Sequence, residues 1–445
     1  PLGLSVTVVE AAALDDADDN DNDATADNQP SFDARTVALT YNARQIYTGI
    51  GVWPQIAPRA QPITEIHVSD RGHFGMARLR CADAGVEALG YVVPTRAIGA
   101  ALHRRLRDND AVEMLCPATV ERIRRCGDRN EVSIRCDAED DRNAVGVRRD
   151  AASEDRNAVG VRNDAENGDR SAIGIRRDTE TDDREHITLR ARLVVLADGG
   201  RSGLAAQVGV ESPRAAYRQR AIVSIVETDR DTRARAYERF TDEGPLALLP
   251  HGARRYAVAW TSAPRHVAAR MALSDDDFAR ALQRAFGDRA GRFARPTARK
   301  CYPLHRGRAA HPVGDRAVVI GDAAHIVHPV AGQGFNLGLR DVAALAEAVH
   351  RAVQTSQDLG DAATLARYAA ARRRETAMVS AFTDGLVRLF ASRRGALAIA
   401  RGIALAGIEL LPPAKRLLLR RTMGLRATHS RLGAGLPLAP NAARD

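Results

Sequence analysis

The residues best suited to chemistry lie in one stretch, 317–341, in which polar residues and glycines follow a short apolar segment. The apolar segment 317–320 (AVVI) is typical of a buried strand of a parallel sheet. Gly321 and Asp322 follow it directly, so we expect them at the carboxyl end of that strand, where open α/β sheets bind ligands. A carboxylate in this place can accept hydrogen bonds from the hydroxyl groups of a sugar or sugar alcohol.

The proline and the glycines of this stretch also restrict or free the backbone in a way that suits binding of a flat ring. Pro329 restricts its own backbone. Gly332 and Gly334, on either side of Gln333, carry no Cβ and let the main chain approach a flat ring. A helix is expected to begin near Asn336, and the amide groups at its start would face an anion. Because reduced flavin carries negative charge on its ring, the pattern favours a flavin site over an ordinary strand–turn–helix corner.

The stretch resembles the second FAD-binding signature of the aromatic-ring flavin monooxygenases, and more closely that of the ubiquinone-biosynthesis hydroxylases. Further segments resemble the same family at 32–39, 50–53, 66–73, 238–250 and 383–390. The resemblance covers nearly the whole chain apart from two inserts and the beginning. It implies an α/β fold, in which a Rossmann-like FAD-binding domain is interleaved with a mixed-sheet substrate domain and followed by C-terminal helices.

The activity that the resemblance implies is that of an FAD-dependent monooxygenase. NAD(P)H or another donor would reduce FAD, and O2 would add at the flavin C4a. The resulting hydroperoxide would transfer one oxygen atom to the ring of a polyprenylated methoxyphenol in ubiquinone biosynthesis. The alternatives are hydroxylation at another ring position, hydroxylation of a simple aromatic compound, or a non-catalytic subunit of a ubiquinone-synthesis complex.

The resemblance also assigns residues to the cofactor. Pro329 and the backbone of 332–334 would line the flavin ring, while Asp322 and Asn336 would bind the ribityl chain or the ring edge. His328 would lie beside the flavin with its neutral ring bonded to the backbone, and it joins Pro329 as a candidate for a catalytic role. Further cofactor contacts are expected from Glu10, Arg35, Arg96, Asp198, Gly199 and Gly321. For the two arginines the alternative is an ion pair at the surface.

The beginning of the chain departs from the family pattern. Members open with a strand, a G-x-G-x-x-G turn and a helix that holds the FAD pyrophosphate. Here the chain opens with Pro1, and its first apolar run, 6–9, resembles the second strand of that unit, with Glu10 as the acid that binds the adenosine ribose. We therefore expect the first βα unit to be absent and interpret the sequence as a fragment, whose affinity for FAD is in question.

The resemblance predicts three parts that alternate along the chain. The apolar run 193–197, which ends at Asp198, is typical of a buried strand, whereas 221–226 and 256–260 alternate like a half-buried sheet. The predicted FAD-binding domain comprises 1–60, 95–204 and 300–355, the substrate domain 61–94 and 205–299, and the C-terminal helical region 356–445.

Two segments have the composition of inserts in the predicted FAD-binding domain. The acidic segment 15–30 offers almost nothing to bury and is expected to be a solvated loop. In 128–186 the pair Asp-Arg recurs about every 14 residues, with alternating apolar and polar positions between the recurrences. This pattern predicts strand–turn units added to a small meander. Calcium binding is disfavoured, because the aspartate spacing is wrong for an EF-hand loop and the arginines repel cations.

Charge and cysteine usage restrict the partners and the compartment. The net charge of +9 is concentrated in 367–426, which holds 13 Arg and Lys against 3 Asp and Glu. There it alternates with apolar residues, which predicts amphipathic helices with basic faces. These faces would touch a membrane surface or a protein partner, or belong to solvated helices packed on the FAD-binding domain. No motif of nucleic-acid binding accompanies it. Five cysteines without a paired spacing favour a reducing cytoplasm, with association at the inner face of the cytoplasmic membrane as an added expectation.

A metal site is not expected. His325 and His328 form an H-x-x-H pair, but a turn before proline would not place them on one helix face, and no third ligand stands near them in the sequence.

Overall fold

The computed structural model describes residues 3–12, 35–136, 176–178, 185–391, 395–424 and 430–438. The predicted acidic loop 15–30 and the central repeat units lie outside the described residues.

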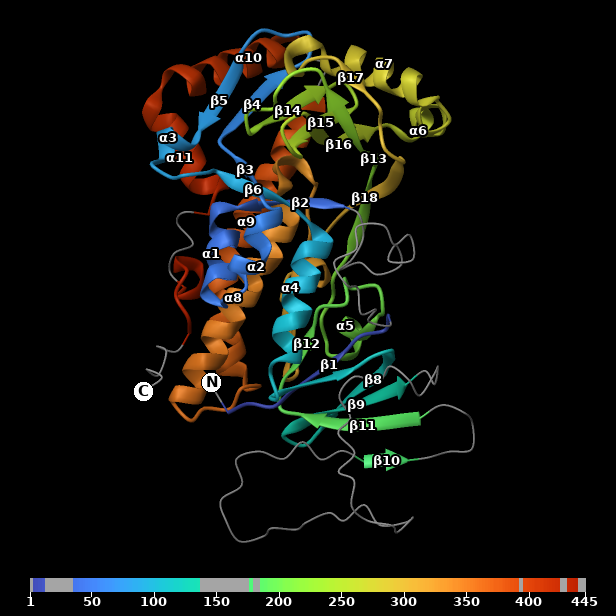
Figure 1. Cartoon of the computed structure of the whole chain (residues 1–445). Helices are drawn as coiled ribbons and strands as arrows, with labels where there is room; N and C mark the ends of the chain where they lie inside the picture. The colour runs from blue at the N-terminus through green and yellow to red at the C-terminus, as the bar shows by residue number, and fades with distance from the viewer. Residues whose placement is uncertain are drawn as a thin grey trace.

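The largest layer is a mixed sheet of nine strands at the top of Figure 1, in the order β21-β18-β13-β16-β15-β14-β4-β5, with β17 pairing to β13. Its strands are β4 (Glu65–Asp70), β5 (Met76–Arg80), β13 (Arg214–Thr228), β14 (Arg235–Thr241), β15 (Gly244–Pro250), β16 (Arg255–Ser262), β17 (Phe293–Ala294), β18 (Lys300–Arg308) and β21 (His325–Ile326). Helices α6 (Pro264–Met271) and α7 (Asp275–Phe286) and the short turn η3 (Asp288–Ala290) follow β16 in the chain. Tyr237, Trp260 and Phe286 form the core between this sheet and α7.

Parallel strands form the part of the fold that the flavin signature predicts. β1 (Val6–Val9) pairs with β7 (Val112–Leu115), and β12 (Val194–Leu196) pairs with β20 (Ala317–Val319), which is flanked by the antiparallel β19 (Val313–Gly314). The strands expected at 6–9, 193–197 and 317–320 are therefore present. Burial of β12 was overestimated, however, because Val195 is 43% exposed. Helix α8 (Gln333–Gln354) packs against β20, since its Leu345 and Ala348 cluster with Val318, and α4 (Thr95–Arg107) lies near these strands in Figure 1.

A small antiparallel sheet, β2-β6-β3, lies between the two larger layers in Figure 1. Its strands are β2 (Thr36–Thr40), β6 (Gly90–Pro94) and β3 (Gln61–Ile63), and the nearby helices are α1 (Tyr41–Gly49), α2 (Trp53–Ile56), η2 (Ala57–Arg59) and α3 (Cys81–Ala84). Tyr47, Ile56 and Val93 pack together in its core.

A second antiparallel sheet, β10-β11-β9-β8, lies at the bottom of Figure 1. It consists of β8 (Ala118–Cys126), β9 (Arg129–Cys136), β10 (Arg176–Asp178) and β11 (Glu185–Ala191), with α5 (Leu204–Gln207) against β8. The first Asp-Arg pair stands in the β8–β9 turn, where Gly127 adopts a φ of 59°. In the described part of the repeat region, the chain is thus strand and turn, as the pattern predicts.

The chain ends in long helices. α9 (Ala362–Ala391) packs along α8, and α10 (Gly395–Leu410) and α11 (Pro412–Thr422) lie at the upper left of Figure 1, before the short turn η6 (Leu432–Ala434). In the described residues, no single helix is long and apolar enough to cross a membrane. A pair bent by 95°, Ala396–Leu410 with Pro412–Arg420, reaches the required length and composition together.

The charged residues of α10 do not form the expected basic face. Arg401 is buried and donates from Nε to Asp70 of β4 at 3.0 Å. Glu409 accepts from the backbone N–H of Arg78 at 2.8 Å and from its guanidinium at 2.7 Å. Both charges therefore point inward to the β4–β5 hairpin. Large apolar side chains are exposed instead. The expectation was wrong because helical periodicity alone does not show which side of a helix faces the protein.

Strand pairing also crosses the predicted domain boundaries at two places. β3 and β6 were expected in the substrate domain but pair with β2, which belongs to the FAD-binding part. β18 was expected in the FAD-binding domain but extends the large sheet beside β13. In both places, a boundary drawn from sequence motifs alone separates strands that pair with each other.

Candidate functional site

Two turns meet at the carboxyl ends of β12 and β20. The parallel register places Leu196 opposite Val319, so the turns that follow these strands are neighbours. A Cβ on Gly200 would lie 3.0 Å from the Cα of Ala323. Arg214 of β13 donates to the carbonyl oxygens of Gly199 and, at 3.5 Å, of Asp322. The Asp198–Gly199 turn and the Gly321–Asp322 turn are thus brought together, as their positions after apolar strands predict.

Asp198 shapes the first of these turns. Its carboxylate accepts hydrogen bonds from the backbone N–H of Gly200 at 2.9 Å and from the hydroxyl of Ser202. Burial tends to raise the pKa of Asp198, but these hydrogen bonds outweigh it and hold the pKa below its usual value. Asp198 is therefore ionised and its carboxylate is bonded within its own turn, whereas Asp322 is exposed.

The turn before α8 has a left-handed backbone at two consecutive residues. Ala331 has a φ of 59° and Gly332 a φ of 60°, and α8 begins at Gln333, three residues earlier than expected. A Cβ on Gly332 would lie 3.2 Å from the Cβ of Ala38, so this glycine is needed for packing inside the protein. At Gly334 a Cβ would meet only Val327, at 3.7 Å. The space in front of Gly334 is thus left open to a ligand.

Asn336 is engaged by the protein on both sides of its amide. Its Oδ1 accepts from the backbone N–H of Thr40 at 2.7 Å, and its Nδ2 donates to the carbonyls of Ala38 at 2.8 Å and Gly332 at 2.6 Å. The side chain is 1% exposed. The predicted direct contact with the flavin would require these bonds to break, so the geometry favours a positioning role that ties the start of α8 to β2.

His328 is buried inside the protein and does not face the cavity that the turn borders. Its side chain is fully buried, and Nδ1 accepts from the backbone N–H of Val330 at 3.1 Å. Burial lowers the pKa of His328 to about 4, so the ring is neutral and Nε2 carries the proton. The expected bond from a neutral ring to the backbone is present. A catalytic contact is not supported, since His328 does not border the cavity described below.

A buried set of charged side chains holds the Gly321–Asp322 turn in place. Asp341 of α8 accepts from the backbone N–H of Gly321 at 3.0 Å, from Nε2 of His325 at 2.5 Å and from Nε of Arg372 at 2.7 Å. Burial tends to raise the pKa of Asp341, but the bonds from His325 and Arg372 keep it low. His325 is thus fixed by a carboxylate, and the network links the Gly321 backbone to α8 and α9.

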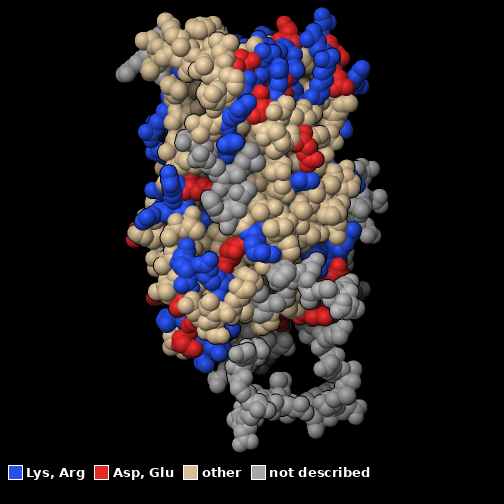
Figure 2. Space-filling model, turned by 90° about the vertical axis from the view of Figure 1, so that its left-hand side faces the viewer, with Lys and Arg blue, Asp and Glu red and all other residues tan. Residues whose placement is uncertain are grey.

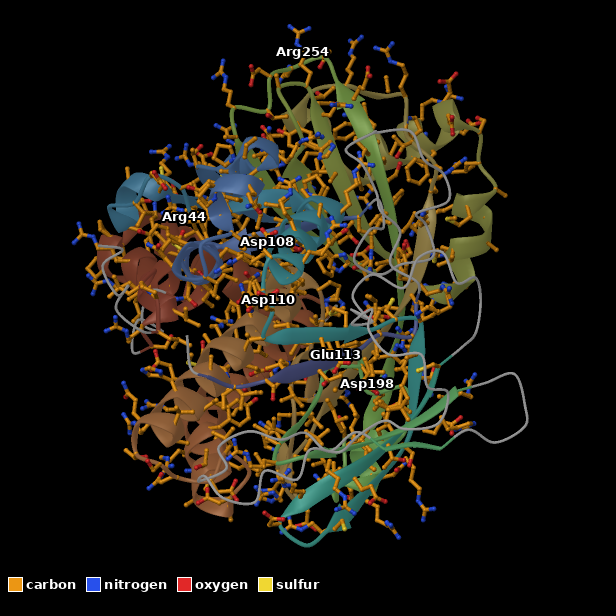
Figure 3. The ribbon with its side chains drawn as sticks, turned by 60° about the horizontal axis from the view of Figure 1, so that its bottom comes forward. Arg44, Asp108, Asp110, Glu113, Asp198 and Arg254 are labelled. Carbon is orange, nitrogen blue, oxygen red and sulfur yellow. The ribbon has the colours of Figure 1, made fainter. Side chains whose placement is uncertain are left out.

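These features border one cavity of about 2600 Å³ between the parallel strands and the large sheet. Of the residues predicted for the site, Glu10, Arg35, Asp198, Gly199, Gly321, Asp322, Pro329, Gly332, Gln333 and Gly334 line it. Arg96, Asn336 and His328 do not. On α4 the lining comes from Thr95, Ile98, Gly99 and Leu102, so the predicted contact of Arg96 with the cofactor gains no support. Figure 3 labels Asp198 in a view in which the bottom of the molecule is turned toward the viewer.

Arg35 and Tyr302 stand together on the wall of the cavity. The Arg35 guanidinium lies 5.2 Å from the centre of the Tyr302 ring, and Tyr302 belongs to β18 of the large sheet. The predicted cofactor arginine is therefore held at the junction of the two layers. Glu10 lies beyond the end of β1, and its Oε1 accepts from the backbone N–H of Ala12 at 3.0 Å.

Glu238 of β14 was missed as a site residue. It lines the cavity, and its Oε2 accepts from the backbone N–H of Ala331 at 3.3 Å, in the turn before α8. Burial raises its pKa to about 7, with a smaller opposing effect from the Ala331 N–H. The sequence contains a signal for it, since Ala236, Glu238 and Phe240 share one face of the strand and only one of them is polar.

The donor set of the cavity fits a flavin nucleotide. An open glycine at the start of a helix, an exposed aspartate at the end of a parallel strand and an acid after β1 line one continuous space. A model of the FAD-binding domain family matches residues 147–383. A ubiquinone hydroxylase, UbiL of Rhodospirillum rubrum, is 33% identical over 416 residues, which covers 92% of this chain and 84% of the relative. The chain belongs to the FAD-dependent ubiquinone-biosynthesis hydroxylases.

A further relative agrees with this family, and a solved structure shares the fold. The human ubiquinone biosynthesis monooxygenase COQ6 is 30% identical over 262 residues, covering 51% of this chain and 56% of that protein. The p-nitrophenol 4-monooxygenase PnpA of Pseudomonas putida superposes with a TM-score of 0.66 at 16% identity, covering 97% of this chain and 93% of that structure. As a member of this family the chain is an FAD-dependent aromatic monooxygenase, for which O2 and NAD(P)H are the typical co-substrates.

Proposed function

We propose that this monooxygenase hydroxylates the ring of a polyprenylated methoxyphenol in ubiquinone biosynthesis. The relatives named for ubiquinone synthesis support the pathway. Support for a prenylated substrate comes from the cavity, whose upper end is apolar. There it is lined by Phe240, Phe390, Leu405, Ile408, Leu418 and Met423. This end runs beneath α10 and α11 and would accept a long hydrocarbon tail while the ring lies near the turn before α8.

Bound FAD would supply the activation of O2. The chain's own residues would bind and orient the reactants. Asp322 would accept hydrogen bonds from ribityl hydroxyls, and the backbone of Gly332–Gly334 would lie against the flavin ring at the positive end of α8. Glu10 would bind the adenosine ribose, and Arg35, fixed against Tyr302, would contact the cofactor where the two layers meet. The apolar lining would exclude water from the reacting ring.

The experiment that tests this proposal compares two substrates. The FAD-loaded enzyme is incubated with NAD(P)H and either a methoxyphenol bearing a farnesyl chain or the same phenol without the chain. We expect ring hydroxylation of both, with a KM at least about tenfold lower for the farnesylated compound, because several buried methylene groups each contribute about 0.8 kcal/mol. Equal KM values would favour the simple aromatic alternative. Identification of the product would decide which ring carbon is oxidised.

We also propose a peripheral contact with the inner face of the cytoplasmic membrane. The exposed side of α10 and α11 supports it, since it carries Ile399, Ile403, Leu410, Leu411 and Leu417, each at least 43% exposed. The exposed residues Arg416 and Arg420 stand on α11, where they could meet anionic headgroups. Figure 2 shows this end of the molecule as an uncharged area at the upper left. A bilayer at this face would deliver a prenylated phenol next to the apolar end of the cavity. Assembly with other proteins of ubiquinone synthesis is a further expectation.

A further inference from the structure

The carboxyl group of Glu238 lies on a wall of the cavity to which β14 and nearby strands of the large sheet, all within the described residues, contribute no other charged side chain. The large sheet turns its inner face to the cavity, and β4, β5, β14, β15 and β16 all contribute to the lining. Among the residues they contribute, which are all described, Glu238 is the only charged one. Its neighbours on this wall include Val68, Ala236, Phe240 and Leu249. A carboxyl group in such surroundings loses much of its hydration, which is costly unless the group is paired.

The pairing of Glu238 is incomplete. Its Oε2 accepts one hydrogen bond, from the Ala331 N–H at 3.3 Å, while Oε1 is inaccessible to solvent and has no hydrogen-bond partner in the described residues. The partner of Oε2 belongs to the turn that would carry the flavin ring. The carboxyl group thus lies on the cavity wall beside the flavin turn, with one of its two oxygens left without a partner in the described residues.

Burial is also what raises the pKa of Glu238 to about 7. Near neutral pH the carboxyl group can therefore exist in either form, which suits a group that takes up a proton and releases it again.

We propose that Glu238 is a catalytic residue, which binds the phenolic hydroxyl of the substrate and takes its proton during ring hydroxylation. The hydroxyl donates to the carboxylate, which a rotation of the side-chain carboxyl group can present to the cavity. As the ring is oxidised, the phenolic O–H bond breaks, the proton forms a new O–H bond on the carboxylate, and the electron pair stays on the phenolic oxygen. The added electron density reaches the ortho and para carbons of the ring, where an electrophilic oxygen atom attacks. The carboxyl group later returns the proton to water. This assignment rests on the proposed substrate class.

A purely structural role is the competing explanation. In that case Glu238 would only hold the left-handed turn through the Ala331 N–H, and its loss would disturb the flavin rather than the phenol. The two roles differ in what the side chain must recognise. A turn anchor is indifferent to the substrate hydroxyl, whereas a phenol ligand distinguishes a phenol from its methyl ether.

The experiment measures binding without turnover. The FAD-loaded enzyme is titrated, in the absence of NAD(P)H, with a methoxyphenol carrying one short prenyl group and with its O-methyl ether, and the dissociation constants are obtained by calorimetry. We expect wild type to bind the phenol at least about tenfold more tightly than the ether. Glu238→Ala should lose this preference. Glu238→Gln, which is isosteric but cannot take a proton, should keep FAD affinity within about threefold. In a separate turnover assay with NAD(P)H, this variant should lose at least about a hundredfold in kcat. The control is Asp242→Asn, an exposed carboxylate just beyond β14, which should behave like wild type.

Each result has one meaning. Equal binding of phenol and ether by wild type, or a preference that survives in Glu238→Ala, would overturn the assignment while leaving the hydroxylase function in place. A loss of FAD affinity in both variants with an intact preference for the phenol would establish the turn anchor instead. Failure of wild type to bind either compound would contradict the proposed substrate class itself, and the assignment would fall with it.

Discussion

At the scale of single residues, the turn before α8 depends on a neutral histidine. His328 has a pKa near 4 in the folded protein, against 6.5 for an ordinary histidine, because burial disfavours its charged form. Between these values the unfolded chain binds more protons than the folded one, so the free energy of unfolding falls as the pH is lowered. The loss amounts to roughly 3 kcal/mol from pH 6.5 to pH 4.

Replacing His328 by asparagine tests this origin of acid sensitivity. The asparagine side chain would offer an oxygen to the Val330 N–H in place of the imidazole Nδ1 but cannot be protonated. We expect the difference in unfolding free energy between His328→Asn and wild type to move in favour of the variant as the pH falls from 6.5 to 4. Urea denaturation at several pH values measures it. A difference that does not change with pH would contradict the assignment of a buried neutral ring.

Residues differed in how far the sequence could predict their roles. The places of Asp322, Gly332 and Gly334 on the cavity wall were predictable, because a strand end and a glycine-rich turn leave local signals in residue type and spacing, while their contacts with the cofactor stay predictions. Asn336 was not, because its amide is satisfied by Thr40, which is 296 positions away. Glu238 was passed over for a similar reason, since its contact with Ala331 depends on how β14 packs against the turn.

At the scale of elements, α10 has its charges inside and its apolar side chains outside. The ion pairs of Arg401 with Asp70 and of Glu409 with Arg78 attach it to the β4–β5 hairpin. The outward side of α10 carries large apolar side chains, such as that of Ile403, which is 60% exposed. The sequence predicted the helix and its apolar content. It could not predict the direction of the two charges, because their partners lie more than 300 positions away in the chain.

If the outward face of α10 contacts a membrane, acidic residues on this face should weaken membrane binding. The double variant Ile403→Glu and Leu410→Glu should keep its fold, since both side chains are exposed, by 60% and 76%. Its partition onto vesicles of phosphatidylglycerol and phosphatidylethanolamine should fall at least about tenfold, since each lost burial contributes on the order of 1 kcal/mol. Co-sedimentation measures it.

A matched control is available on α9. Met378 is 41% exposed, and Met378→Glu adds the same charge to another apolar surface position. Membrane contact through α10 requires this variant to sediment like wild type. Equal sedimentation of the double variant and wild type would exclude the α10 face as the contact.

At the scale of the whole molecule, the chain passes repeatedly between the parallel strands and the large sheet. β13 and β18 run from one layer to the other, and the cavity between the layers is lined by residues from Gly3 to Met423. The layers were predictable, because apolar runs and alternating runs differ in sequence. The exchange of β3, β6 and β18 between layers was not, because pairing partners far apart in the chain decide it. A cofactor in this cavity would touch both layers at once.

This arrangement predicts that FAD stabilises the molecule as a unit. At a free concentration of about a hundred times its dissociation constant, FAD should add about 2.7 kcal/mol to the free energy of unfolding. For a chain of 445 residues that corresponds to a rise in Tm of about 3 °C, in one transition if both layers unfold together. Gly334→Val should abolish the rise, because its side chain would fill the open space at the start of α8.

Gly407→Val serves as the control for this measurement. Gly407 is also helical, with nothing within 4 Å of an added Cβ, so this variant carries the same cost of valine in a helix without entering the cavity. Differential scanning calorimetry with and without FAD should give the full shift for Gly407→Val and none for Gly334→Val. A full shift in both variants would move the flavin away from the start of α8. Two transitions of which only one responds to FAD would mean that the cofactor contacts a single layer. The cofactor site would then consist of residues near the parallel strands alone.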